Sequence, residues 1–135
     1  MRYSLDTDIC IKLMRRAPTV INAITRVGED RCYLSEITLA ELRFGAEFSH
    51  QTALRHAEID DLQLISRLVA IQGAIPVFAR EKARLRRAGE LIPDFDLVIG
   101  ATALTYNLTL VTNNEKHLSR IAGIRLENWF LNPPQ

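Results

Sequence analysis

Short apolar runs alternate along the chain with longer stretches whose apolar residues recur every three or four positions. The short runs predict strands at 3–5, 32–34, 68–71, 108–111 and 124–127. The periodic stretches predict helices at 9–14, 20–27, 38–48, 51–67, 76–88 and 94–104, with a short helix or loop at 113–120. Strands that alternate with helices indicate an α/β fold in which a parallel sheet carries helices on both faces.

Two segments lack a polar side. Residues 68–71 form a continuous apolar run, which predicts a strand buried on both faces. Residues 97–104 are almost all apolar, so we expect the helix that contains them to lie at the centre of the protein.

The length of 135 residues fits one domain, which we place at 1–131, followed by a flexible tail at 132–135. Apolar residues make up 47% of the chain and charged residues 24%, which excludes a disordered protein. The net charge of +1 indicates no nucleic-acid partner by itself, so any such site has to be local. No apolar run reaches the roughly 18 residues of a membrane span. Two cysteines, Cys10 and Cys32, are too few for a disulfide framework, and a reducing cytoplasm is the expected location.

Oxygen-bearing side chains follow the predicted strands. In an open α/β sheet the ligand binds beyond the carboxyl ends of the strands, so these side chains are the candidates for a site. They are Asp6 and Asp8 after the first strand, Glu41 in the helix after the second, Asp94 and Asp96 at the start of the apolar helix, and Thr112, Asn113 and Asn114 after the strand at 108–111.

Helix capping is the alternative explanation for several of these residues. The segments 38–41 and 112–115 both have the Thr-x-x-Glu pattern of a capping box, and Asp94 suits an N-cap. Two residues favour a site instead. Asp6 follows a buried-looking strand, where an unpaired charge is costly, and Asp96 begins a helix that has no polar face.

Three carboxylates and an amide at one crevice repel each other unless a cation lies between them. Hard oxygen ligands without clustered His or Cys favour Mg²⁺ or Mn²⁺. Such ions commonly orient and ionise a water and stabilise charge on a reacting phosphate. The chemistry that this pattern indicates is the hydrolysis of a phosphate ester.

Four stretches and an ending occur in an order that resembles a known family. The stretches are Leu5-Asp6-Thr7-Asp8, Ile37-Thr38-Leu39-Ala40-Glu41-Leu42, Pro93-Asp94-Phe95-Asp96-Leu97-Val98-Ile99-Gly100-Ala101 and Leu110-Val111-Thr112-Asn113-Asn114, and the ending is Gly123-Ile124-Arg125-Leu126-Glu127-Asn128-Trp129. With these residues in this order, the chain resembles a PIN-domain ribonuclease of the VapC toxin type over nearly its whole length.

The resemblance implies a three-layer α/β/α fold with a central, mainly parallel sheet. It also implies an Mg²⁺- or Mn²⁺-dependent endoribonuclease toxin that cuts tRNA or rRNA, forms a homodimer and is neutralised by a cognate antitoxin. The metal-binding acids of the family fall on Asp6, Glu41 and Asp96, and Thr112 matches a hydroxyl that lines the site. The fourth position, often Asp in the family, is Asn114 here, which weakens the expectation of a second metal.

Basic residues crowd the helix expected at 76–88. We expect Lys82, Arg84 and Arg87 to contact RNA phosphates, and the alternative is an ordinary solvated face. The three histidines, His50, His56 and His117, have no partner pattern and are interpreted as surface or packing residues.

Two other functions compete with the nuclease. A strand followed by Asp-x-Asp suits a phosphomonoesterase in which Asp6 is the nucleophile and Asp8 the general acid. The other alternative is an RNA- or protein-binding module without catalysis.

Overall fold

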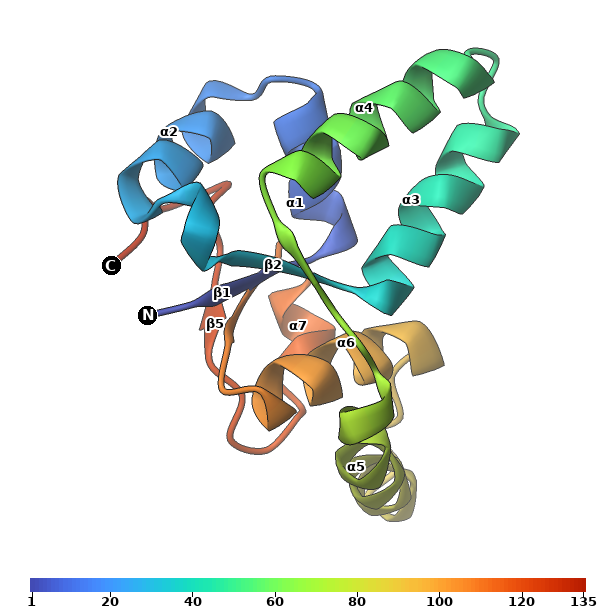
Figure 1. Cartoon of the computed structure of the whole chain (residues 1–135). Helices are drawn as coiled ribbons and strands as arrows, with labels where there is room; N and C mark the ends of the chain where they lie inside the picture. Colours follow the sequence, from blue (N-terminus) through green and yellow to red (C-terminus); the bar gives the residue numbers. More distant parts are fainter.

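Five parallel strands form one sheet with β1 at its centre (Figure 1). The computed structural model describes residues 1–135. The strand order is β3-β2-β1-β4-β5. The strands are β1 (Tyr3–Leu5), β2 (Cys32–Ser35), β3 (Arg67–Val69), β4 (Thr109–Val111) and β5 (Leu126–Glu127).

Helices cover both faces of this sheet (Figure 1). On one side α1 to α4 enclose a core that contains Ile9, Leu42, Ile59 and Trp129, and on the other α5 to α7 enclose a second core around Leu97. The predicted three-layer α/β/α fold is therefore confirmed. The helices are α1 (Thr7–Met14), α2 (Pro18–Val27), α3 (Glu36–Phe48), α4 (Thr52–Leu64), α5 (Ile75–Arg87), α6 (Asp94–Thr105) and α7 (Glu115–Leu118), and short 3-10 turns lie at Glu29–Arg31 and Gln72–Ala74.

The connections after β1 and β2 are as short as a connection can be. Asp6 is both the residue after β1 and the N-cap of α1, and Ser35 is both the end of β2 and the N-cap of α3. The backbone N–H of Asp6 also donates to the carbonyl of Val111, which holds the end of β1 against the end of β4. The carboxyl ends of the central strands therefore deliver side chains to one edge of the sheet.

The expectation of a strand at 68–71 buried on both faces is wrong. β3 spans Arg67–Val69 and lies at the edge of the sheet, where it pairs only with β2, and Leu68 is 50% exposed. A short apolar run does not distinguish a central strand from an edge strand, because its composition carries no information about how many neighbours pair with it.

The helix at 94–105 is central, as its composition predicts. Residues on every side of α6 are buried, among them Leu97, Ile99 and Ala103. The division into a domain at 1–131 and a flexible tail at 132–135 stays a prediction. Within that tail, the side chain of Pro134 is buried.

Two glycines in helices make a matched pair for testing this packing. A Cβ at Gly100 would overlap Ile121 Cδ1, whereas a Cβ at Gly45 on α3 would meet nothing within 4 Å. We expect Gly100→Ala to destabilise the protein by about 1–3 kcal/mol through overpacking. We expect Gly45→Ala to stabilise it by up to about 1 kcal/mol through helix propensity. Urea unfolding of both variants measures these changes, and equal effects would show that α6 does not pack as described.

Candidate active site

The carboxylate of Asp6 is the most buried acid at this edge of the sheet, with 6% of the residue exposed. One of its oxygens accepts from the backbone N–H of Thr7 at 2.8 Å, which caps α1. The other accepts from the hydroxyl of Thr112, which follows β4, at 2.6 Å. The carboxylate is thus fixed by the two central strands that the chain brings together from 106 residues apart.

A chain of hydrogen bonds connects Asp6 to Asp96. Besides donating to Asp6, the Thr112 hydroxyl accepts from the backbone N–H of Asn114 at 2.9 Å. The side-chain amide of Asn114 then donates to Asp96 Oδ2 at 3.2 Å. These hydrogen bonds bring Thr112, Asn114 and Asp96 close to Asp6, although Asp6 and Asp96 lie far apart in the sequence.

Glu41 joins the group through a residue that the sequence analysis did not single out. The hydroxyl of Thr7, directly after Asp6, donates to Glu41 Oε1 at 2.6 Å. The capping interpretation of Thr38 and Glu41 is wrong, because Ser35 is the N-cap of α3 and its hydroxyl accepts from the N–H of Thr38. Glu41 lies in the second turn of the helix, so no capping role occupies its carboxylate.

The other two capping expectations are also wrong. Pro93 is the N-cap of α6, and Asp94 instead forms an ion pair with Lys82 at 3.0 Å. The Thr112 hydroxyl accepts from Asn114 rather than from Glu115, and the Glu115 carboxylate accepts from the side chain of Asn128. Both oxygens of the Asp8 carboxylate accept hydrogen bonds from the backbone, one from the N–H of Ile9 and the other from the N–H of Asn113.

Burial at this edge disfavours the charged forms of Asp6 and Asp8. Burial raises the pKa of Asp6 from 3.8 to about 6, the hydrogen bond from Thr112 opposes this rise, and the negative charges of Asp8 and Asp96 add to it. Burial likewise raises the pKa of Asp8, against the lowering effect of its backbone hydrogen bonds. A cation placed among these oxygens would reverse this penalty, since an opposite charge nearby favours the ionised form.

The donor set consists of carboxylate, hydroxyl and amide oxygens, which suit a hard divalent ion such as Mg²⁺ or Mn²⁺. No group of three or more His, Cys, Asp and Glu side chains lies close enough together in the structure to hold a metal ion by itself. The chemistry of the donors and their mutual repulsion fit such an ion, with the remaining ligands coming from water and substrate, as is usual for Mg²⁺.

His117 is a second neighbour that sequence reasoning missed. Its Nδ1 lies 3.6 Å from Asp96 Oδ2 and 3.4 Å from the amide nitrogen of Asn114. The signal was present in the spacing, because His117 follows Asn114 by three positions, and residues three apart share a face when the chain begins a helix there. Thr7 had a weaker signal: it only separates two acids in Asp6-Thr7-Asp8.

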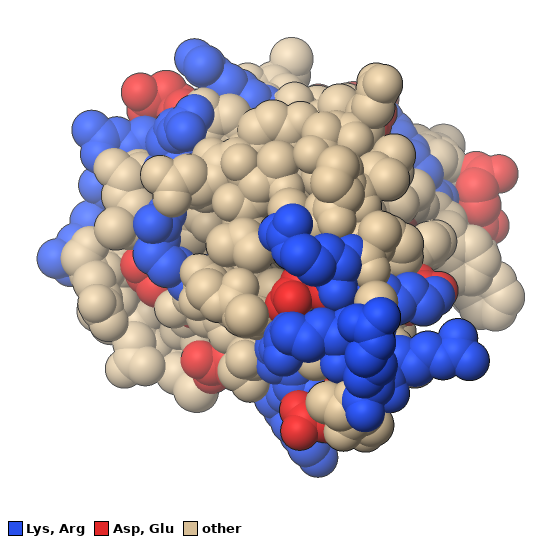
Figure 2. Space-filling model, turned by 90° about the horizontal axis from the view of Figure 1, so that it is seen from below, with Lys and Arg blue, Asp and Glu red and all other residues tan.

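Figure 2 shows Lys and Arg side chains gathered over α5. These side chains differ in how many hydrogen bonds and ion pairs they already form within the protein. Arg84 donates to both oxygens of the buried Glu81 and to the backbone carbonyl of Arg120, and the Arg84 guanidinium lowers the pKa of Glu81. Lys82 pairs with Asp94, whereas Arg87 is exposed and forms no ion pair or side-chain hydrogen bond. Of the three expected RNA contacts, Arg87 is the freest and Arg84 is already used to hold the fold.

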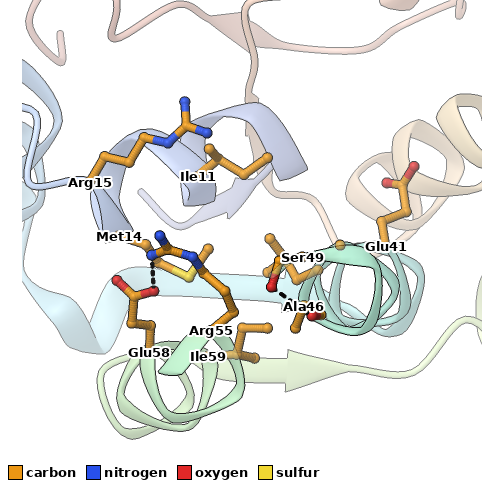
Figure 3. A pocket seen from close by; sticks show the side chains of 11 residues that line it. Ile11, Met14, Arg15, Glu41, Ala46, Ser49, Arg55, Glu58 and Ile59 are labelled. Atoms are coloured by element: carbon orange, nitrogen blue, oxygen red, sulfur yellow. Dashed lines mark hydrogen bonds and ion pairs between the residues drawn. The ribbon is translucent and has the colours of Figure 1, made fainter. Parts of the chain in front are cut away.

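A hollow of about 230 Å³ lies beside Glu41, between α1, α3 and α4 (Figure 3). Its apolar wall includes Ile11, Met14, Leu42 and Ile59. Charged side chains stand around it, including the ion-paired Arg55 and Glu58 and the unpaired Arg15.

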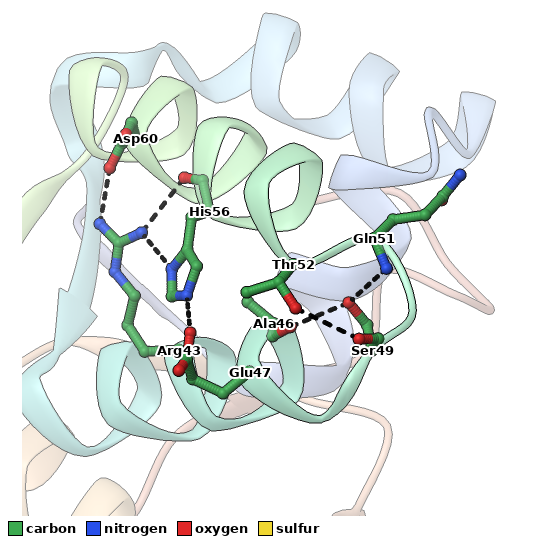
Figure 4. Close-up of polar contacts among 8 residues, drawn as sticks. All are labelled: Arg43, Ala46, Glu47, Ser49, Gln51, Thr52, His56 and Asp60. Carbon is green, nitrogen blue, oxygen red and sulfur yellow. Dashed lines mark hydrogen bonds and ion pairs between the residues drawn. The ribbon is translucent and has the colours of Figure 1, made fainter.

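A polar clamp holds the two helices that border this hollow (Figure 4). Arg43 on α3 donates to His56 Nδ1 and to the His56 carbonyl, and it also pairs with Asp60 at 2.7 Å. The Nε2 atom of His56 lies 2.6 Å from a carboxylate oxygen of Glu47. His56 is therefore a packing residue of the helix pair, as expected.

The chain is similar to several known proteins. The profile of the PIN domain family matches residues 3–124. The chain is 35% identical to Ribonuclease VapC2 of Haemophilus influenzae, over 96% of this chain and 98% of the relative. It is 34% identical to the tRNA(fMet)-specific endonuclease VapC of Salmonella typhimurium, with the same coverage. The crystal structure of VapBC2 from Rickettsia felis bound to a DNA fragment from their promoter contains a chain that matches with a TM-score of 0.89 and 28% identity, over 96% of this chain and 99% of that chain.

The raised pKa of Asp6 makes the stability of the metal-free protein depend on pH. The folded protein holds this proton more tightly than the unfolded chain, so stability falls as pH rises from about 4 to about 6 and then stays low. Two pKa units correspond to about 3 kcal/mol, and Asp6→Asn removes this contribution. In the presence of a chelator we expect Asp6→Asn to be more stable than wild type at pH 8, by up to about 3 kcal/mol less the cost of a lost hydrogen bond.

Urea unfolding at pH 4 and pH 8 measures this difference. The exposed acid Asp30 precedes β2, at the opposite edge of the sheet, so Asp30→Asn serves as the control and should leave the pH profile unchanged. A wild-type stability that rises between pH 4 and pH 6 by the amount attributed to Asp6 would contradict the description of a desolvated, uncompensated carboxylate.

Proposed function

The chain belongs to the PIN domain family, among its VapC members, and from this premise we propose that it is a divalent-metal-dependent endoribonuclease toxin held in check by a cognate antitoxin. The relatives named above are a ribonuclease and a tRNA-specific endonuclease, so tRNA is the favoured substrate class and rRNA the alternative. The observation that carries the proposal is the connected group of Asp6, Glu41 and Asp96 at the carboxyl edge of the sheet.

We assign Asp6, Glu41 and Asp96 as the metal ligands. When bound, an Mg²⁺ or Mn²⁺ ion would neutralise the mutual repulsion of these acids and stabilise negative charge on the scissile phosphate. The buried position of Asp6 supports this assignment, because a carboxylate that is costly to ionise without a cation gains most from binding one.

The neighbouring polar side chains orient these ligands. The Thr112 hydroxyl fixes one oxygen of Asp6, and the Thr7 hydroxyl fixes one oxygen of Glu41, so each carboxylate keeps its other lone pairs for the site. Asn114 turns its amide toward Asp96 and positions that carboxylate, and we place Thr112 and Asn114 in the catalytic group for this reason. A substrate phosphate would approach from the open edge of the sheet.

RNA binding is assigned to the basic face of α5. Arg87 and Lys82 are the phosphate contacts that this proposal relies on most, since the Arg84 guanidinium is largely used by Glu81 and the Arg120 carbonyl. Lys82 also links this face to the site, because its partner Asp94 is two residues from Asp96. Phosphate neutralisation on α5 would therefore continue toward the acids.

The antitoxin is assigned to the hollow between α1, α3 and α4. Its apolar wall suits an apolar segment of a partner chain, and Glu41 at its side could pair with a basic side chain of that partner. Occupation of the hollow would then block one metal ligand.

A homodimer and a place in the cytoplasm complete the proposal. The stacked and exposed Phe44 and Phe48 on α3 support the homodimer, and the two free thiols support the reducing cytoplasm. No helix is long and apolar enough to cross a membrane.

Incubation of the purified protein with total RNA, with Mg²⁺ or with a chelator, tests the nuclease proposal. We expect cleavage only with the metal, and loss of at least about two orders of magnitude in rate for Glu41→Gln and Asp96→Asn, as for the removal of a principal electrostatic catalyst. Asp30→Asn and Glu90→Gln are matched controls on exposed acids and should cleave like wild type.

Three outcomes would favour the alternatives. A trapped aspartyl phosphate, an acyl phosphate formed on Asp6, together with phosphomonoesterase activity would support the Asp6-nucleophile mechanism. Tight RNA binding without cleavage under either condition would support a binding module. Growth arrest on expression of wild type but not of Glu41→Gln is expected of a toxin, and harmless expression of an active nuclease would reject the toxin assignment alone.

Asn114 determines how many metal ions the site holds. A neutral amide is a poorer partner for Mg²⁺ than a carboxylate, so we expect one ion held well and a second held weakly. Asn114→Asp adds a fourth negative charge, which should lower the Mg²⁺ concentration for half-maximal cleavage and destabilise the metal-free protein. Metal titration by calorimetry and cleavage rates measure both effects. If neither Asn114→Asp nor Asn114→Ala changes the Mg²⁺ dependence, Asn114 only forms the turn after β4.

A further inference from the structure

Phe95 is an exposed aromatic side chain in the first turn of α6, directly before the proposed metal ligand Asp96. It is 52% exposed, although its helix is otherwise the most buried in the protein. Full burial of this ring would stabilise the folded protein, and the exposed position loses part of that stabilisation. About half of this residue therefore remains accessible from outside the protein.

The aromatic pairs of the protein involve residues other than Phe95. Phe44 and Phe48, which are also exposed, stack on each other, and Tyr3 packs against Trp129. Phe95 forms no such aromatic pair. With 52% of the residue exposed and no aromatic partner, part of the ring is accessible to a group outside the chain.

The position of Phe95 lies between two chemically different regions. Asp94, on one side, is held by Lys82 of the basic helix α5. Asp96, on the other, is held by Asn114 within the acidic site. Pro93 fixes the start of the helix, and the Lys82–Asp94 ion pair ties that start to α5, so Phe95 projects from a restrained segment.

Because Asp94 contacts the basic helix and Asp96 belongs to the acidic site, a nucleic-acid strand that extends from one to the other would run beside the intervening Phe95. Its phosphates would contact the basic side chains and its cleaved phosphate the acids, which leaves the intervening base beside Phe95. Base stacking on an aromatic side chain is the usual way in which proteins hold an unpaired nucleotide, and it tolerates any base because every base has a π-face.

We propose that Phe95 stacks on a base next to the cleaved phosphodiester and so positions the RNA strand for cleavage. This inference rests on the proposed nuclease function and adds a positioning residue to it. A base within a duplex is stacked on its neighbours and would have to be extruded first, at a cost in free energy.

The test compares Phe95→Leu with Phe95→Tyr in steady-state cleavage of a single-stranded oligoribonucleotide that wild type cuts. Leucine keeps an apolar side chain but removes the ring, so we expect KM to rise about tenfold, in the range known for loss of one stacked base. Tyrosine keeps the ring and should restore the wild-type KM. Leu64→Ala, which shortens an exposed apolar side chain at the end of α4, is the control and should behave like wild type.

A second substrate separates stacking from a general structural effect. The same oligoribonucleotide is made with an abasic residue at each position flanking the cut. Wild type should lose about tenfold on one of these substrates, whereas Phe95→Leu should lose nothing further there, because the base and the ring act as one interaction. Wild type should also cleave the annealed duplex of this sequence more slowly than the single strand.

Several results would overturn the inference. They are an unchanged KM for Phe95→Leu, equal losses of both proteins on every abasic substrate, or equal cleavage of single strand and duplex by wild type. A change in molecular mass of Phe95→Leu in size-exclusion chromatography would assign the ring to a protein interface instead. If wild type cleaves no RNA at all, the proposed nuclease function fails and the role of Phe95 fails with it, a result distinct from a failure confined to the Phe95 variants.

Discussion

The desolvated carboxylate of Asp6 is the constraint on which the arrangement around the site depends. It lies at the end of the central strand, where burial alone favours the neutral, protonated form of the carboxyl group. The fold retains it by supplying one N–H from Thr7 and one O–H from Thr112, and two further acids lie close enough to oppose its ionisation. A protein that keeps like charges together in this way is less stable than it could be, and clustered acids of this kind are a common property of functional sites.

A short connection and hydrogen bonds also hold the residues around this carboxylate in place. Asp6 is the single residue between β1 and α1, and the hydroxyls of Thr7 and Thr112 are both used in hydrogen bonds to acids. On the other side of the sheet, the buried Glu81 ties α5 to the backbone of Arg120 and Ala122 through Arg84 and its own carboxylate. The basic helix is therefore held in place by an ion pair that is itself partly buried, and its exposed charges remain for contacts outside the chain.

The sequence predicts the layers and most of the strands and helices, because apolar periodicity reports which side of each element is buried. It also predicts which strand ends carry acids. It does not predict hydrogen-bond partners: Thr38, Asp94 and Thr112 all have cap-like spacings, yet Ser35, Pro93 and Asn114 precede the helices. A capping pattern needs only two residue types at the right interval, whereas the real cap depends on where the preceding strand ends. The edge position of β3 was invisible for a similar reason, since strand order is a property of the whole sheet.

The contact between Asp6 and Thr112 has a consequence for the time at which the site comes into existence. During synthesis at about 5–20 residues per second, the first acid waits roughly 5–20 s for the hydroxyl that fixes it. Strand β4, which lies beside β1 in the finished sheet, is made after β2 and β3, so the central pairing forms late. A nascent nuclease is surrounded by the RNA of the ribosome that makes it. The topology of this sheet therefore delays the assembly of its acidic edge until β4 and Thr112 have been made.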